Sequence, residues 1–313
     1  MSKHSTHDVL VVGAGPAGLT TAVALARHGI DVLVVERHAG TSPFPKATGV
    51  STRTMEVLRS WGLDQQARAG GMRVRPVISV SDTLIGPEHA AESFNYPTAE
   101  QALAVSPTTP AYLPQDHLEP VLLGHLVERG GTVRFHTEVT DLQITEHGVR
   151  AQLRDRRTGH LAQADTRFVV GADGPRSTVR AALGIDYEAL GTIGDYVAVI
   201  FRSELAERLP RVPGVVNSVQ TPAGPGCSCP PTTTTGGCTA GSGRMGRSTP
   251  MTGRTSASSS SCARAAGCPT WPYRSSRCCR SPWPASWPRN FAAARRSWSA
   301  TPRTAPRRWA ASA

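Results

Sequence analysis

One stretch, from Asp8 to Glu36, constrains the fold more than any other part of the chain. It begins with an apolar, β-branched run, which is typical of a strand buried on both faces of a parallel sheet. A glycine-rich turn follows, and then an alanine- and leucine-rich segment with no helix breaker before Gly29. A second apolar run, Asp31 to Val35, ends at Glu36. The sequence therefore predicts a strand–turn–helix–strand unit of the kind that binds a dinucleotide.

The turn, GAGPAG, has the glycine spacing that phosphate binding requires. Gly13 permits the tight turn, Gly15 lets the backbone approach a pyrophosphate, and Gly18 lets helix and strand pack closely. The helix N-terminus adds unpaired N–H groups and partial positive charge. A carboxylate at Glu36 suits the ribose hydroxyls of an adenosine and disfavours a 2′-phosphate, so we expect FAD or NAD, not NADP, as the tightly held nucleotide. The alternative is a glycine turn without a ligand, which the complete unit disfavours. The candidate residues here are Gly13, Gly15, Pro16, Ala17, Gly18, Glu36 and Arg37.

The composition changes abruptly near Gln220. The chain has 313 residues, a net charge of +11 and a pI near 10, totals that would suggest binding to nucleic acid or an anionic membrane. The region after Gln220 lacks Asp, Glu, Lys, His, Leu, Ile and Val, yet holds all seven cysteines and 13 of the 34 basic residues. That leaves 21 basic against 23 acidic residues before it. The basic character therefore belongs to the tail, and we expect neither a nucleic acid nor a membrane as partner.

The N-terminal part favours a cytoplasmic protein. The residues before the first strand are few and polar, so they do not resemble a secretory signal. No apolar run approaches the length that spans a membrane. Cysteine is absent before the tail, which fits a reducing compartment.

Between Glu36 and the tail, the pattern alternates between helices and strands. Helical signals begin at Ser51 or Thr52 and at Asp116, each a candidate cap, and at Ser177 before Gly184. Strand signals, several with apolar–polar alternation, cover 74–95, 132–136, 139–144, 149–154 and 196–201. The basic residues Lys46 and Arg53 follow the nucleotide unit closely, and we weigh a role near phosphate or flavin equally against solvated surface charge.

A second buried strand enters a glycine turn at residues 168–177, FVVGADGPRS. Asp173 lies at its carboxyl end, where ligands bind in doubly wound sheets. We therefore expect an α/β protein: a Rossmann-type FAD-binding domain with an inserted antiparallel β-sheet substrate domain, followed by an irregular tail. The expected boundaries are 1–73 and 111–185 for the FAD-binding domain, 74–110 and an incomplete 186–220 for the substrate domain, and 221–313 for the tail.

Three motifs together resemble the FAD-dependent aromatic-ring monooxygenases, the para-hydroxybenzoate hydroxylase-like flavoproteins that include polyketide hydroxylases. GAGPAG with Glu36 resembles their nucleotide fingerprint. PKATGVSTRTMEVL resembles the segment along the flavin, with Lys46 replacing the more usual arginine and its bidentate fork. GADGPRS resembles the motif whose aspartate, here Asp173, contacts the FAD ribityl chain and is linked to NAD(P)H use. The likeness covers about Val9 to Val219.

The resemblance implies FAD as the bound cofactor, with NADPH or NADH as transient reductant. It implies O2 and an aromatic phenol or polyketide as substrates, hydroxylated through a flavin C4a-hydroperoxide, and leaves the oligomeric state open. Neither the residues nor the resemblance points to a catalytic base or a metal site. Two alternatives remain: a flavin-dependent reductase or epoxidase acting on an olefin, and a non-catalytic nucleotide-binding remnant. The flavin contacts implied are Lys46, Arg53, Gln115, Asp173 and Gly174.

The family's third motif, G-D-A-A-H near residue 300, is absent from the tail. A disordered basic tail, a cysteine-rich metal site and an out-of-frame translation are the possible explanations. The pairs Cys227/Cys229 and Cys278/Cys279 have the wrong spacing for zinc, and no histidine follows residue 220. Nucleic-acid binding would rest on the arginines alone, since few aromatic residues are placed to stack on bases.

The genetic code favours the third explanation. Combining the last base of each codon with the first two of the next, residues 297–313 permit LVGDAAHRTTPMGGLG. Third bases are mostly free, but the two tryptophan codons fix a valine and a glycine. Residues 226–241 in the same phase permit VLMPTDNDDRWVYGR, a plausible strand–turn–strand. We interpret the tail as a frameshift product, and therefore expect it to be irregular and FAD to bind weakly.

Overall fold

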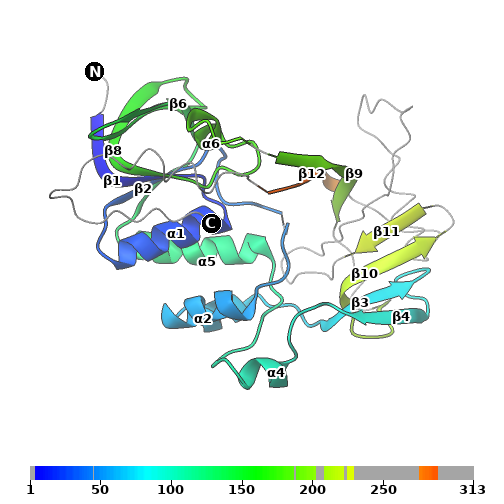
Figure 1. Cartoon of the computed structure of the whole chain (residues 1–313). Coiled ribbons are helices and arrows are strands. Elements are labelled where there is room, and N and C mark those ends of the chain that lie inside the picture. The colour runs from blue at the N-terminus through cyan, green and yellow to red at the C-terminus, as the bar shows by residue number, and fades with distance from the viewer. Residues whose placement is uncertain are drawn as a thin grey trace, which may run out of the picture. The chain divides into compact units, whose positions relative to one another are not determined.

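The computed structural model describes residues 4–44, 46–186, 188–201, 208–221, 224–228 and 275–287. The chain divides into two compact units, each with its own sheet (Figure 1). The first comprises residues 1–43, 118–189 and 286–313, and the second comprises 44–117 and 190–285. Residues 44–73 and 111–117, which we expected in the nucleotide-binding domain, group with the second unit. The two stretches pair with each other, since Val50 and Ala111 exchange backbone hydrogen bonds of 2.8 and 3.0 Å.

The sheet of the first unit has the order β5-β2-β1-β8-β7-β6. Its parallel part contains β5 (Thr132–Arg134), β2 (Val32–Val35), β1 (His4–Val12) and β8 (Leu161–Gly171). The antiparallel part adds β7 (Gly148–Asp155) and β6 (Thr137–Thr145). Val12 pairs in register with Val35 on one side and Gly171 on the other. The carboxyl ends of β2, β1 and β8 therefore lie together at one edge.

The predicted strand–turn–helix–strand unit is confirmed. Helix α1 (Pro16–Arg27) connects β1 to β2 and contacts both strands, and Gly29 beyond its end has the left-handed φ of 72° that suits a helix stop. Every residue from Val9 to Val12 and from Val32 to Val35 is buried, because the parallel strands are covered on both faces. One face of them joins the core of β6, β7 and β8, through Leu10, Val12, Leu33, Val35, Leu142 and Leu153.

Of the two helices predicted to begin near Asp116 and Ser177, the first begins earlier than expected and the second begins as expected. Helix α5 (Gln115–Glu128) starts one residue before Asp116, so Asp116 lies inside the first turn and is not its cap. The Oδ1 atom of Asp116 is buried without a hydrogen-bond partner among the described residues. Helix α6 (Thr178–Ala182) starts as predicted, since Ser177 Oγ accepts a hydrogen bond from Arg180 N at 2.9 Å.

The second unit contains a four-stranded sheet of order β11-β10-β3-β4. The predicted strand region 74–95 forms a hairpin of β3 (Arg75–Ser81) and β4 (Glu88–Ser93), and β10 (Gly214–Thr221) runs parallel to β3. Helix α2 (Thr52–Ser60) begins at the predicted cap Ser51, whose Oγ accepts from Thr54 N at 3.3 Å. Two short helices, α3 (Asp64–Ala69) and α4 (Ala99–Leu103), were not predicted. The capping-box pattern of Thr98 and Gln101 in the sequence indicates the start of α4.

Strands also occur within the region that we expected to be irregular. They are β11 (Gly224–Ser228), paired with β10, and β12 (Ser275–Trp287), paired with β9 (Glu188–Phe201). Backbone pairing requires no apolar side chain, so the absence of Leu, Ile and Val does not prevent a two-stranded ribbon. The rest of the predicted irregular tail lies outside the described residues.

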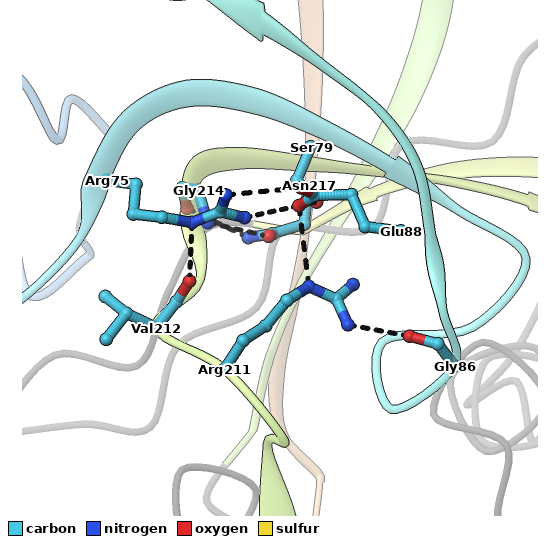
Figure 2. A network of polar contacts seen from close by, with 8 residues as sticks. All are labelled: Arg75, Ser79, Gly86, Glu88, Arg211, Val212, Gly214 and Asn217. Atoms are coloured by element: carbon cyan, nitrogen blue, oxygen red, sulfur yellow. Dashed lines mark hydrogen bonds and ion pairs between the residues drawn. The ribbon is translucent and has the colours of Figure 1, made fainter.

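A polar network centred on Glu88 connects β3, β4 and the segment that leads into β10 (Figure 2). Glu88 accepts hydrogen bonds from Arg75 and from Ser79 Oγ, and its Oε2 lies 3.4 Å from Arg211 Nε. Arg211 also donates to Gly86 O at 2.7 Å, and Arg75 Nε donates to Val212 O at 2.9 Å. The hydrogen bonds from Arg75 and Ser79 lower the pKa of Glu88 to about 2.

We expect Glu88→Gln to reduce the free energy of unfolding by about 2 kcal/mol, because two arginines lose their carboxylate partner. Since the pKa in the folded state is depressed, the carboxylate's contribution is complete above its ordinary pKa of 4.5 and is lost as the pH falls towards about 2. Urea denaturation at pH 7 and pH 3 measures both effects. Glu92→Gln, on the exposed part of β4, is the matched control. An equal loss for both variants would show that the network does not stabilise the sheet.

Candidate nucleotide-binding site

The glycine turn after β1 packs against the turn that follows β8. Gly13 has a φ of +106°, and a Cβ placed on it would lie 2.2 Å from Ala172 O. A Cβ on Gly18 would lie 2.0 Å from Gly13 O. The backbone N–H of Ala172 donates to Val12 O at 2.8 Å. Both glycines are therefore required for packing, and they place the GAGPAG and GADGPRS motifs side by side.

Gly15 differs from its two neighbours. A Cβ placed on it would meet no atom of the described residues within 4 Å, so the turn is open on this side. Gly15 is the N-cap of α1, Pro16 occupies the first turn, and no side chain caps the helix. The start of α1 thus has open space beside Gly15 and no side-chain cap among the described residues, which fits a pyrophosphate bound by the backbone N–H groups of the first turn.

The carboxylate of Glu36 faces this turn. Its Oε2 accepts a hydrogen bond from Ala14 N at 2.9 Å, and its Oε1 accepts from His38 N at 2.9 Å. The Nδ1 atom of His38 lies 2.5 Å from the same Oε1. Burial raises the pKa of Glu36, but these hydrogen bonds outweigh it, so the pKa is lower than usual and the group is ionised at neutral pH. Sequence reasoning found Glu36 from its spacing but gave no reason to select His38.

Asp173 lies at the end of β8, as predicted, with its carboxylate directed to α6. Oδ1 accepts from Ser177 Oγ at 2.5 Å, and Oδ2 accepts from Thr178 N at 2.6 Å and Val179 N at 3.2 Å. The adjacent Gly174 has a φ of +81° and open space around it. Arg37, next to Glu36, is exposed. The structure thus brings the glycine turn, Glu36 and Asp173 to one sheet edge, and any contact of these residues with a nucleotide stays a prediction.

The predicted flavin contacts Lys46, Arg53 and Gln115 belong to the second unit. Gln115 N donates to Ala47 O at 2.8 Å, which fixes the start of α5 beside the 46–53 segment. Lys46 is exposed. Arg53 is also exposed, and its guanidinium donates to Glu56 at 2.8 Å. Both basic side chains are therefore at the surface of this unit.

Three aromatic rings that the sequence analysis did not select form a cluster in the second unit. Tyr96 and Tyr112 stack with ring centroids 5.9 Å apart, and Phe94 meets both edge-on. The hydroxyl of Tyr112 is buried and has no hydrogen-bond partner among the described residues. Burial, with a smaller effect from Tyr96, raises the pKa of Tyr112. A Cβ on Gly49 would lie 3.1 Å from Tyr96 Oη, so this aromatic cluster packs against the 46–53 segment.

Comparison with known families identifies the nucleotide. The family model described as the FAD binding domain matches residues 6–259. The chain belongs to the FAD binding domain family. FAD is therefore the cofactor, which resolves the choice between FAD and NAD that the fingerprint left open.

Individual relatives of this FAD binding domain chain are hydroxylases and monooxygenases. It is 42% identical over 214 residues to aklavinone 12-hydroxylase DnrF of Streptomyces peucetius, covering 65% of this chain and 42% of that protein. The flavin-dependent monooxygenase PieE, solved with FAD and substrate, matches with a TM-score of 0.82 and 28% identity over 92% of this chain and 51% of its own. Aklavinone-11 hydroxylase with FAD and aklavinone matches with a TM-score of 0.79 and 31% identity over 93% and 56%.

These matches confirm the resemblance to FAD-dependent aromatic monooxygenases and the expected α/β fold class. The chain spans about half the length of the relatives it matches. Within the described ranges, no helix has both the length and the apolar character needed to cross a membrane.

Proposed function

We propose that this chain derives from an FAD-dependent, NAD(P)H-using monooxygenase that hydroxylates an aromatic phenol or polyketide with O2. The observation that supports this most is the ionised Glu36 carboxylate held against an open glycine turn, within a chain whose relatives include aklavinone hydroxylases. The aromatic cluster of the second unit adds support, because its rings and the unpartnered Tyr112 hydroxyl suit an oxygenated aromatic molecule. A cytoplasmic location is part of the proposal, since NAD(P)H is the reductant.

In this proposal the first unit binds and orients the cofactor. The N–H groups of Gly15 and Ala17 at the start of α1 hold the pyrophosphate, and Pro16 between them, which has no N–H, fixes its own φ for the helix start. Glu36 accepts hydrogen bonds from the adenosine ribose, beside Arg37, and Asp173 with Gly174 borders the ribityl chain. When bound, FAD supplies the redox chemistry that transfers one oxygen atom of O2 to the ring, with NAD(P)H as the electron source.

The second unit contributes positive charge and shape. Lys46 and Arg53 are exposed cations on the segment proposed to run along the flavin, and Gln115 lies at the start of α5 beside it. Such charges favour the anionic phosphates of the cofactor. The aromatic cluster is the proposed wall for the flat substrate.

The decisive experiment uses a chain whose reading frame is restored at the codons for residues 221–229, supplied with FAD, NADPH or NADH, and a polyketide phenol. We expect the phenol to accelerate NAD(P)H oxidation and, under 18O2, to gain one labelled oxygen atom. Glu36→Gln in the same chain should lose this acceleration, because the cofactor is held less tightly. If bound FAD were reduced at the same rate with and without any phenol, and no label were incorporated, the hydroxylase proposal would be wrong. The chain would then derive from a flavin reductase.

A further inference from the structure

The hydrogen-bonding capacity of the Glu36 carboxylate is nearly exhausted by protein donors. A carboxylate offers about four acceptor positions, two on each oxygen. On Oε1, both are taken by His38, through its backbone N–H at 2.9 Å and its ring Nδ1 at 2.5 Å. On Oε2, one is taken by Ala14 N at 2.9 Å. A single position therefore remains, on Oε2.

The two donors from His38 differ in how firmly they are held. The backbone is fixed, since His38 O accepts from His136 N and Glu36 O accepts from Thr137 N, both at 2.8 Å. The imidazole is not enclosed: its side chain is 64% exposed, against 12% for Glu36. Nδ1 must carry a hydrogen in this contact, because an ionised carboxylate only accepts. The ring is therefore a donor that can rotate into solvent while the backbone stays in place.

The adenosine ribose presents two neighbouring hydroxyls, both of which can donate to an acidic residue at this position of the fold. One hydroxyl fits the remaining position on Oε2. The second needs a position on Oε1, and of the two donors that the described residues place there, the His38 ring is the movable one. The imidazole of this contact is mostly exposed, so water can replace the carboxylate as the partner of Nδ1, and giving up the hydrogen bond costs little.

We propose that His38 competes with the adenosine ribose for Glu36 Oε1, holding the carboxylate in the nucleotide-free protein and rotating away as a ribose hydroxyl takes its place. This inference rests on the proposed role of Glu36 as the ribose ligand. His38 is thus a positioning residue that lowers the affinity for the nucleotide and decides how strongly the individual hydroxyls contribute.

The test measures dissociation constants of the full chain for ADP, 2′-deoxy-ADP and 3′-deoxy-ADP by isothermal titration calorimetry. In His38→Ala we expect ADP to bind about threefold more tightly, the factor that a weak exposed pair supplies. One of the two deoxy nucleotides, the one lacking the hydroxyl that needs Oε1, should bind as it does to the unsubstituted chain. Arg37→Ala is the matched control, because loss of this exposed neighbouring cation should shift all three nucleotides alike.

Weaker or unchanged ADP binding by His38→Ala, or an equal shift for all three nucleotides, would overturn the inference. Glu36→Gln separates this failure from failure of the proposed function. If Glu36→Gln weakens ADP binding while His38→Ala does not tighten it, only the competition is wrong. If Glu36→Gln leaves ADP binding unchanged, or the unsubstituted chain binds no ADP, then the ribose role of Glu36 is wrong and the inference falls with it.

Discussion

Replacing Gly15 by alanine should weaken FAD binding strongly and leave the fold unchanged. The backbone of Gly15 has a φ of −78°, which alanine adopts without strain, and a Cβ there meets no atom within 4 Å. The added methyl group would occupy the space in which we place the pyrophosphate. Losing close contact with the N–H groups of α1 should weaken FAD binding about 100-fold, or about 2.7 kcal/mol.

Gly18 serves as the control, because its replacement should destabilise the fold and not only the FAD site. In Gly18→Ala the new Cβ would lie 2.0 Å from Gly13 O, a backbone atom that cannot move away without opening the turn. We expect this variant to lose about 3 kcal/mol of stability or more, and FAD binding as a consequence of misfolding. Flavin fluorescence quenching and thermal unfolding of the FAD-free chain measure the two effects separately. A Gly15→Ala chain that binds FAD normally would exclude this turn as the phosphate site.

The nucleotide edge was predictable because its signals are local. The glycine turn, the helix and the second strand all lie within Asp8–Glu36, and their order and spacing are those of a dinucleotide-binding unit. The position of Asp173 followed from the same rule about the carboxyl ends of strands. His38 was missed because its role depends on a side-chain orientation that spacing along the sequence does not specify.

The second unit was less predictable because its contacts join distant residues. Arg75 and Val212 are 137 positions apart, yet they form one hydrogen bond of the network around Glu88. Alternation in residues 74–95 indicated antiparallel strands but not that β10 would pair beside them in parallel. The pairing of Val50 with Ala111 is likewise a contact between distant residues that no local pattern indicates.

Resequencing the gene across the codons for residues 221–229 should reveal a single-base error or lesion that changes the reading frame. The composition changes near Gln220, and the match to DnrF covers 65% of the chain. Downstream, one constant shifted phase permits both a strand–turn–strand segment and the G-D-A-A-H motif near residue 300. If the source gene has no such change, the frameshift explanation is wrong and the printed chain is the natural one.

Restoring the frame should convert a chain that loses FAD on gel filtration into one that elutes yellow with stoichiometric flavin. The restored segment adds apolar side chains that a core needs, whereas the region after Gln220 as printed has no Leu, Ile or Val to bury. It also adds the third motif, which the family resemblance implies binds the ribityl and pyrophosphate parts of FAD. Absorbance of flavin relative to protein after gel filtration measures the result. Gly15→Ala in the restored chain should elute colourless, which ties retention to the glycine turn. Stoichiometric FAD on the printed chain would instead show that the first half of the fold holds the cofactor alone.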